Sequence, residues 1–418
     1  MPTSPRLVLI AASVLVVAAV GVGGFFAVRG LSGDDDEAPA PPVALKEEEG
    51  DDDEPKAAEE LGFPAFATKN TTRIGGNDEA ADAAGAALAT FPSVGGVDRP
   101  AAVTLVPSSD WAAGVAASVL VSDPIRAPIL LGDDDGVPDE TETALDAMQP
   151  EGSPETTDAQ VLRVGDVEVP GGLRALEVPG GSAAEVANGV DKLRQRLSDE
   201  KPENIVLAST EDPAYAMPAA AWAARSGDPV LFVERDAVPE ATIEALKRHE
   251  GVPAFLIGPE LVASEKVVDE VEKHAPAVQR ISGEDPVTSA IAFARFDAGT
   301  FGWNITDPGH GLVIANSSRP LDAAAAAPLS ASGKWGPLLV SDDADAVPAP
   351  LRGFLLDIKP GYRSDPSRAF YNHAWLIGDN SALSVAFQAQ VDDALELVRI
   401  ETGAAGPRTG AARSGGRD

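Results

Sequence analysis

The chain has 418 residues, no cysteine and a formal net charge of −34 at pH 7. The lack of cysteine excludes a disulfide framework, thiol catalysis and a thiolate metal site. Because so acidic a chain is repelled by nucleic acid and by anionic lipid surfaces, DNA and RNA are excluded as favoured partners.

An apolar run of 22 residues without a charge extends from Leu7 to Val28, between Arg6 and Arg29. A helix of this length spans a hydrocarbon core of about 30 Å. Cleaved signal peptides have a shorter apolar region, of about 7–15 residues, and a small-residue cleavage site. We therefore predict one uncleaved signal-anchor transmembrane helix within residues 1–30, with the remainder outside the membrane.

Acidic side chains dominate the segment that follows. Residues 31–60 hold 13 acidic side chains against two lysines, and prolines interrupt them. Such a segment buries too little apolar surface to offset the entropy of ordering it. We predict a disordered acidic linker over residues 31–66, acting as an extended spacer, and a second disordered segment at 401–418.

The same plan of elements occurs three times between these segments. Each copy has an apolar strand, a polar stretch, a helix of small residues, a second apolar strand, an acidic loop and a Val-Pro pair before another helix. The second strands start at Pro128, Pro229 and Pro337, which lie 101 and 108 residues apart. Solenoid repeats have periods of about 20–50 residues, so this period indicates repeated whole subdomains.

Each copy also has flanking elements in a fixed order. A strand and a helix come first, with the helices expected at about 78–88, 182–197 and 285–296. Ser182 and Glu185 form a capping-box pattern at the start of the second of these helices. A late strand ends at Gly165, Gly258 or Gly378. A last helix is expected only in copies two and three, at about 262–274 and 382–397.

Strands that are apolar on both faces and alternate with helices indicate parallel sheets covered on both sides. We therefore predict an α/β body of three tandem Rossmann-like modules, at residues 67–172, 173–277 and 278–400. The alternative is one large doubly wound domain with a duplicated half, which the threefold occurrence of the period disfavours.

Polar residues at the carboxyl ends of the first strands are the best candidates for ligand contact, because such folds place ligands there. They are Ser108, Ser109 and Asp110 in copy one, and Ser317, Ser318, Arg319 and Asp322 in copy three. The competing interpretation, which we favour for Asp110 and Asp322, is that these two residues cap the following helices.

Two acidic loops, Asp133–Asp135 and Asp342–Asp345, have a composition that suits Ca²⁺. Neither has the EF-hand spacing, and solvated loops are the simpler interpretation. The four histidines are scattered, and the sequence contains no nucleophile elbow, Walker loop or dinucleotide fingerprint. We therefore predict no catalytic residue, metal or cofactor. Trp111, Trp222 and Trp335 are candidates for stacking on sugars, although Trp222 lies among alanines and is expected in the core.

The ordered set of motifs resembles the cell wall-binding repeat 2 family, which occurs as three tandem modules in exported bacterial surface proteins. Copy three carries the resemblance best, through Arg280 to Asp285, Leu321 to Ala323, Pro337 to Leu339 and Leu376 to Gly378. The resemblance implies Toprim-like modules around a pseudo-threefold axis and non-covalent attachment to an anionic wall polymer. It adds the motif arginines Arg73 and Arg280 to the candidate binding residues.

Together these observations predict a non-enzymatic cell-envelope protein that binds a cell-wall anionic polymer or peptidoglycan. Its location would be the cell membrane, as a single-pass protein with an extracytoplasmic, wall-associated body. Two alternatives stay open: a divalent-metal-dependent envelope enzyme of Toprim-like descent, and a scaffold for an envelope protein partner.

Overall fold

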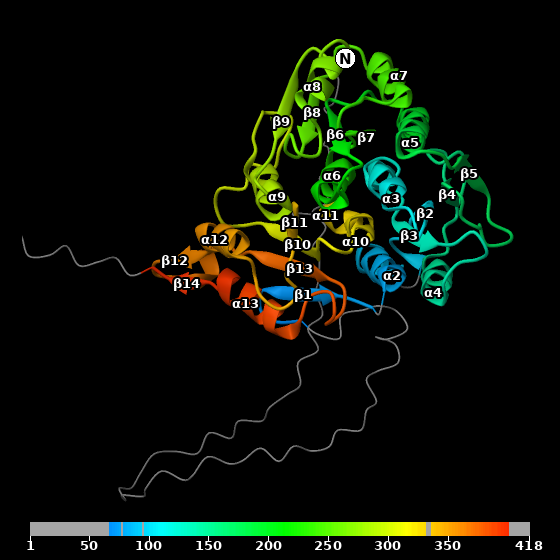
Figure 1. The fold of residues 1–418 in the computed structure, drawn as a ribbon. Coiled ribbons are helices and arrows are strands. Elements are labelled where there is room, and N and C mark those ends of the chain that lie inside the picture. The colour runs from blue at the N-terminus through cyan, green and yellow to red at the C-terminus, as the bar shows by residue number, and fades with distance from the viewer. Residues whose placement is uncertain (1–66, 77, 94–95, 332–335, 401–418) are drawn as a thin grey trace, which may run out of the picture. The chain divides into compact units, whose positions relative to one another are not determined.

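The computed structural model describes residues 67–76, 78–93, 96–331 and 336–400 (Figure 1). The predicted signal anchor, the acidic linker and the carboxyl-terminal tail lie outside these residues. Across the described ranges, the structure contains no helix that is both long and apolar enough to cross a membrane. All the described residues belong to one compact unit of the chain.

The described chain forms three parallel four-stranded sheets, which confirms the predicted α/β class with parallel sheets and three modules. Sheet 1 has the order β3 (Ile129–Gly132), β2 (Val103–Pro107), β4 (Val161–Val164), β5 (Ala175–Val178). Sheet 2 has the order β7 (Val230–Val233), β6 (Ile205–Ser209), β8 (Ala254–Ile257), β9 (Val278–Ile281). Sheet 3 has the order β11 (Leu338–Ser341), β10 (Gly311–Asn316), β13 (His373–Ile377), β1 (Thr71–Ile74). A short parallel pair, β12 (Gly361–Tyr362) and β14 (Val398–Arg399), lies apart from these sheets.

The last strand of every sheet comes from a different copy of the sequence repeat. Strands β5 and β9 open copies two and three but pair with β4 and β8 of the preceding copy. Strand β1 opens copy one and pairs with β13 of copy three. The predicted boundaries 67–172, 173–277 and 278–400 therefore describe the period of the sequence, and each sheet combines residues of two copies.

Each of the strands β1, β5 and β9 is followed by a helix that packs on a different sheet from the one that the strand joins. Helix α2 (Glu79–Thr90) packs on β3 of sheet 1, α5 (Ala183–Ser198) on β7 of sheet 2, and α9 (Pro286–Arg295) on β11 of sheet 3. Ser182 and Glu185 form the predicted capping box at the start of α5. The chain thus passes from one module into the next through a strand and its following helix.

Four helices of small residues pack between the three sheets (Figure 1). They are α3 (Trp111–Ala117), α6 (Pro213–Ser226), α10 (Leu321–Ala325) and α11 (Ala327–Ala331), with the short helix η2 (Ser118–Val121) beside them. A Cβ atom at Gly114 of α3 would lie 2.9 Å from the Cβ of Ala324 in α10, so these two helices need glycine at this contact. Trp222 of α6 is 7% exposed, which confirms that it belongs to the core. The alanine runs of the sequence are therefore explained by close helix packing.

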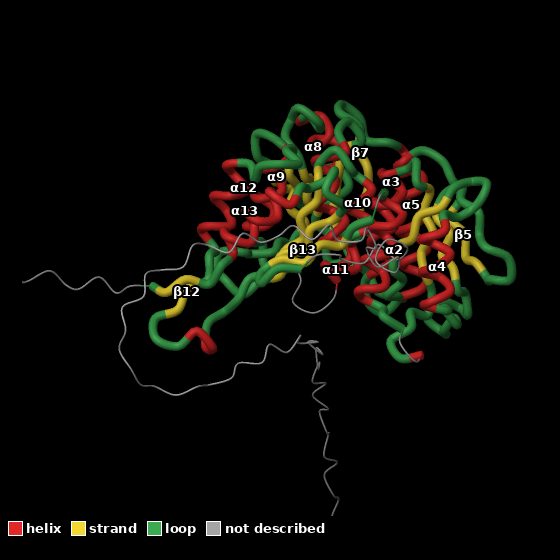
Figure 2. Tube along the Cα trace, turned by 90° about the horizontal axis from the view of Figure 1, so that it is seen from below, coloured by secondary structure: helices red, strands yellow, loops and turns green. Residues whose placement is uncertain are grey.

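The remaining helices lie outside the central four, and those after the Val-Pro pairs pack on α2, α5 and α9. Helices α4 (Asp139–Met148), α7 (Glu240–Arg248) and α12 (Ala349–Asp357) follow the Val-Pro pairs, and η3 (Pro366–Arg368) lies in a later loop. Helices α8 (Glu265–Val271) and α13 (Val385–Leu395) are the last helices of copies two and three, and α13 lies beside α12 (Figure 2). Both start later than predicted, at Glu265 and Val385, because hydrogen-bonded turns follow Gly258 and Gly378. Sheet 1 has a loop in this place, as predicted.

Replacing Ile74 of β1 tests whether this strand completes sheet 3. Ile74 is fully buried, and we expect Ile74→Ala to lower the free energy of unfolding by about 2–5 kcal/mol through lost contacts and a residual cavity. Urea denaturation measures the change. The control is Leu261→Ala, at a side chain that is 64% exposed, for which we expect about 0.5 kcal/mol or less. Equal effects of the two substitutions would contradict the placement of β1.

Candidate functional site

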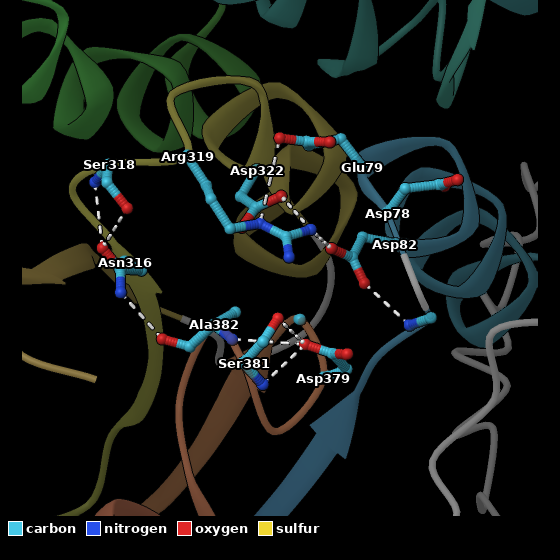
Figure 3. Close-up of polar contacts among 12 residues, drawn as sticks. Asp78, Glu79, Asp82, Asn316, Ser318, Arg319, Asp322, Asp379, Ser381 and Ala382 are labelled. Carbon is cyan, nitrogen blue, oxygen red and sulfur yellow. Dashed lines mark hydrogen bonds and ion pairs between the residues drawn. The ribbon is translucent and has the colours of Figure 1, made fainter. Parts of the chain in front are cut away.

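The carboxyl edge of sheet 3 brings together polar residues from both ends of the described chain (Figure 3). Strand β1 runs through Gly75 and Gly76 into α2, and β10 runs through a short loop into α10. A Cβ atom at Gly75 would lie 2.5 Å from the carbonyl oxygen of Gly378, so glycine is needed for this close approach of backbones. The first turn of α2 therefore faces the loop that follows β10.

Arg319 is the centre of this edge and interacts with three carboxylates (Figure 3). Its Nη2 donates a short hydrogen bond to Asp82 Oδ2. Its Nε lies 3.0 Å from Asp322 Oδ2 and 3.9 Å from Glu79 Oε1. Asp82 also accepts a 2.9 Å hydrogen bond from the backbone N–H of Gly76. We call Arg319, Glu79, Asp82 and Asp322 the Arg319 cluster.

The two aspartates of the Arg319 cluster are completely buried, whereas the Arg319 side chain is 14% exposed. Burial raises the pKa of Asp322 to about 7, against the opposing effect of Arg319. Burial and the charge of Asp322 also raise the pKa of Asp82 well above its ordinary value. Burial lowers the pKa of Arg319, but the charges of Asp322, Asp82 and Glu79 outweigh it and leave that pKa raised. Both shifts favour the protonated form of the two aspartates, which limits the negative charge buried around one guanidinium.

The capping predictions have different outcomes in copies one and three. Asp110 Oδ1 accepts a 2.9 Å hydrogen bond from Ala113 N–H, so Asp110 caps α3 as predicted. The same prediction for Asp322 is wrong, because α10 starts at Leu321 after Pro320 and has no side-chain cap. Arg319 follows the last residue of β10 by three positions, as Asp110 follows the last residue of β2. The structural counterpart of Asp110 is therefore Arg319.

Sequence reasoning missed Asp82 and Glu79 as members of this site. Both lie in an alanine-rich helix that the sequence assigns to copy one, whereas Arg319 belongs to copy three. The sequence feature that could have indicated the site was Asp82 itself, because it is a charged residue in a helix whose other buried residues are almost all alanines. An acidic residue at a buried helix position indicates a buried partner.

The predicted serines contribute to the loops after β2 and β10, at the carboxyl edges of two different sheets. Ser108 Oγ donates to Asp133, and Ser109 lines an open pocket of about 320 Å³ beside Asp110. Ser317 N–H donates to Ser341 O at 2.8 Å, and Ser318 donates to Asn316 Oδ1 from both its N–H and its Oγ. The structure therefore brings Arg319 and Asp322 together and places Ser109 and Asp110 at sheet 1.

Arg73 and Arg280 occupy equivalent positions on the last strands of sheets 3 and 2. Arg73 donates to the carbonyl oxygens of Gly378 at 2.8 Å and Asp379 at 2.9 Å, and to Gln388 of α13 at 3.1 Å. Burial lowers its pKa. Arg280 donates to Gly258 O at 3.1 Å and to Glu265 of α8 at 2.8 Å. Both arginines therefore connect a strand end to the covering helix.

Sheet 1 has no helix between β4 and β5, in the place of α8 and α13, and its charges at these positions are reversed. Glu177 stands at the position of Arg73 and Arg280, and it accepts a 3.2 Å hydrogen bond from Arg163 of β4. Sheets 2 and 3 have leucine at the position of Arg163, namely Leu256 and Leu376. In sheet 1 an ion pair between neighbouring strands thus occupies the position of an Arg–Leu pair in sheets 2 and 3.

The acidic loops show turn structure. Asp343 Oδ1 accepts hydrogen bonds from the N–H groups of Asp345 at 2.8 Å and Ala346 at 3.0 Å, and these bonds lower its pKa. Within the described ranges, no group of three or more histidine, aspartate or glutamate side chains is arranged to hold a metal ion. Trp111 packs edge-on against Phe232 with ring centroids 5.6 Å apart, and Trp335 lies outside the described residues.

The fold has known structural neighbours. It is similar to that of the cell wall protein Cwp6 from Clostridium difficile, with a TM-score of 0.62 and 20% identity, over 78% of this chain and 48% of that one. Cwp8 from the same organism gives a TM-score of 0.59 and 19% identity, over 78% of this chain and 52% of that one. This chain therefore spans about half the length of either protein. No family model and no curated protein sequence matches the chain. Likeness at this identity shows a shared fold, and the nature of these neighbours agrees with the kind of family that the motifs resemble.

Removing the guanidinium of the Arg319 cluster tests its contribution to stability. Arg319→Ala leaves Asp82 and Asp322 buried without a cation, so we expect a loss of about 3–5 kcal/mol in the free energy of unfolding. Urea denaturation at neutral pH measures it. In the matched control, Lys192→Ala removes an ion pair to Glu244 whose side chains are each 53% exposed, and we expect about 1 kcal/mol or less. A loss no greater than that of the control would show that the cluster does not stabilise the fold.

The raised pKa of Asp322 predicts a pH dependence of stability. An acid whose pKa rises on folding, here from an ordinary value of 3.8 to about 7, favours the folded state most below its unfolded pKa. This contribution is lost as pH rises from about 4 to about 7. Asp322→Asn mimics the protonated acid and cannot titrate. The wild type therefore loses stability over this pH interval and the variant does not. We expect the free energy of unfolding of the variant, relative to that of the wild type, to increase as pH rises from about 4 to about 7. Denaturation curves at several pH values measure it, and a difference independent of pH would contradict the prediction.

Proposed function

We propose that this chain is a non-enzymatic cell-envelope protein that binds a cell-wall polymer non-covalently through its three modules. The observation that carries the proposal is the three-module fold shared with the cell wall proteins Cwp6 and Cwp8. In this proposal the apolar run from Leu7 to Val28 anchors the chain in the membrane, and the modules lie outside it as a single-pass, wall-associated body.

Two features of the described residues support a binding role. The motif arginines and the Arg319 cluster hold strands and helices together, so the carboxyl edges are rigid. The edge of sheet 1 forms an open pocket lined by Ser109, Asp110, Asp133 and Asp166, which gives a wall polymer a polar surface. Its charge is negative, so contact with an anionic polymer there requires a bridging cation.

Co-sedimentation with isolated cell-wall sacculi tests the proposal. The full-length chain in mild detergent is mixed with sacculi before and after removal of the anionic polymer, with Ca²⁺ and with a chelator. We expect the chain to sediment with intact sacculi and to lose binding on removal of the polymer. Binding that also depends on Ca²⁺ identifies a cation between acidic loops and polymer.

The outcomes separate the proposal from its alternatives. Binding to intact and stripped sacculi alike assigns peptidoglycan as the ligand. Recovery of the chain in the supernatant under every condition contradicts wall binding and favours a scaffold for an envelope protein partner. Asp110→Asn with Asp133→Asn tests the sheet 1 pocket, and Asp357→Asn, at an exposed residue of α12, is the matched control.

A further inference from the structure

A groove of about 830 Å³ lies at the amino ends of β6, β10 and β11, the edge opposite to that of the Arg319 cluster. Its lining comes from the segments that lead into β6, β10 and β11, from the end of α6 and from the loop before β13. It includes Glu203, Ser226, Trp303, His310, Gly336 and Phe370. This volume is in the range of ligand sites, about 300–1,000 Å³.

Aromatic rings form one wall of the groove, and hydrogen bonds hold that wall in place. The rings of Trp303 and Trp222 meet edge to face, at 84° and 5.4 Å between centroids. Trp222 Nε1 donates a 2.9 Å hydrogen bond to Asp228, which also accepts from the backbone N–H of Asn204. Asn204 in turn donates to the carbonyl oxygen of Thr300. The aromatic wall is thus fixed before any ligand arrives, which lowers the entropic cost of binding.

One further aromatic feature of the groove is unexplained by the packing of the fold. Phe370 is 72% exposed and packs over Gly309, with its Cβ 3.3 Å from where a side chain at Gly309 would begin. A large ring left exposed beside a groove that already has an aromatic wall is a surface that a ligand can cover.

The polar residues around these rings carry both signs of charge. Glu203 and Asp307 are acidic, whereas Arg225 is basic and His310 lies 3.3 Å from Asp307. Because acidic and basic side chains both line the groove, it does not favour a ligand of one charge, and an uncharged ligand meets no electrostatic repulsion there. Carboxylate, guanidinium and imidazole groups supply donors and acceptors for hydroxyl groups.

We propose that this groove binds a neutral glycan segment, with sugar C–H faces against Phe370 and Trp303 and sugar hydroxyls hydrogen-bonded to the polar residues. Aromatic rings with apolar faces and polar neighbours suit ligands that have both apolar and hydroxylated faces. That the glycan belongs to the cell wall rests on the proposed function. That the ligand is a neutral carbohydrate rests on the groove itself.

Binding of short neutral oligosaccharides prepared from the wall polymer removed from the sacculi tests this proposal. The full-length chain in mild detergent is titrated with these oligosaccharides and followed by calorimetry and by tryptophan fluorescence. We expect saturable binding that weakens about ten-fold in Phe370→Ala, because one stacking contact is lost from an exposed side chain. Trp303→Phe keeps a smaller ring in the aromatic wall, and we expect a smaller loss. The matched control is Tyr371→Ala, at the neighbouring residue, which is 50% exposed and does not line the groove.

The result that overturns the proposal is the absence of oligosaccharide binding, or binding that Phe370→Ala and Trp303→Phe leave unchanged. If the wild-type chain binds sacculi and both variants bind them equally well, the groove is not the glycan site, but the proposed function stands. If oligosaccharide binding depends on Phe370 but the chain does not bind sacculi, the groove is a glycan site and the proposed function is wrong. Far-ultraviolet circular dichroism of each variant shows that its fold is retained.

Discussion

The backbone hydrogen bonds between β1 and β13 join the first copy of the repeat to the last, and the positions of the other modules depend on this closure. Ala374 N–H donates to Asn70 O at 2.9 Å, and Gly378 N–H donates to Ile74 O at 2.8 Å. Strands β5 and β9 make the same kind of connection between successive copies. Because each copy completes its neighbour's sheet, a single copy of the sequence does not contain all four strands of a sheet.

This closure also explains why charged residues are buried at the edge of sheet 3. Helix α2 follows β1 directly, so its first turn is brought against the loop after β10, where Arg319 satisfies Asp82 and Asp322. An ion pair buried in this way adds less to stability than its geometry suggests, because both partners lose their hydration. Its clearer effect is to make one arrangement of α2 and α10 preferable to others, since any other leaves a buried charge unpaired.

The two edges of the sheets have different character. At the carboxyl edges, side chains mostly satisfy one another: Asp110 caps α3, Arg73 binds a strand end, and Arg319 neutralises buried acids. At the amino edge beside α6, the large ring of Phe370 is exposed. Ligands of α/β folds are usually sought at the carboxyl ends of strands, so the amino-edge groove departs from that expectation.

The amino-acid sequence by itself determined the features that depend on neighbours in the chain. The threefold repeat, the parallel α/β class, the capping box at Ser182 and Glu185, the cap at Asp110 and the missing helix after β4 were all predictable, because periodicity and capping are local. Which strand joins which sheet was decided only by the tertiary structure. Asp82 and Arg319 are 237 residues apart, and no local pattern reports a contact at that separation. The groove at Phe370 and Trp303 depends in the same way on segments that meet only when the modules pack together.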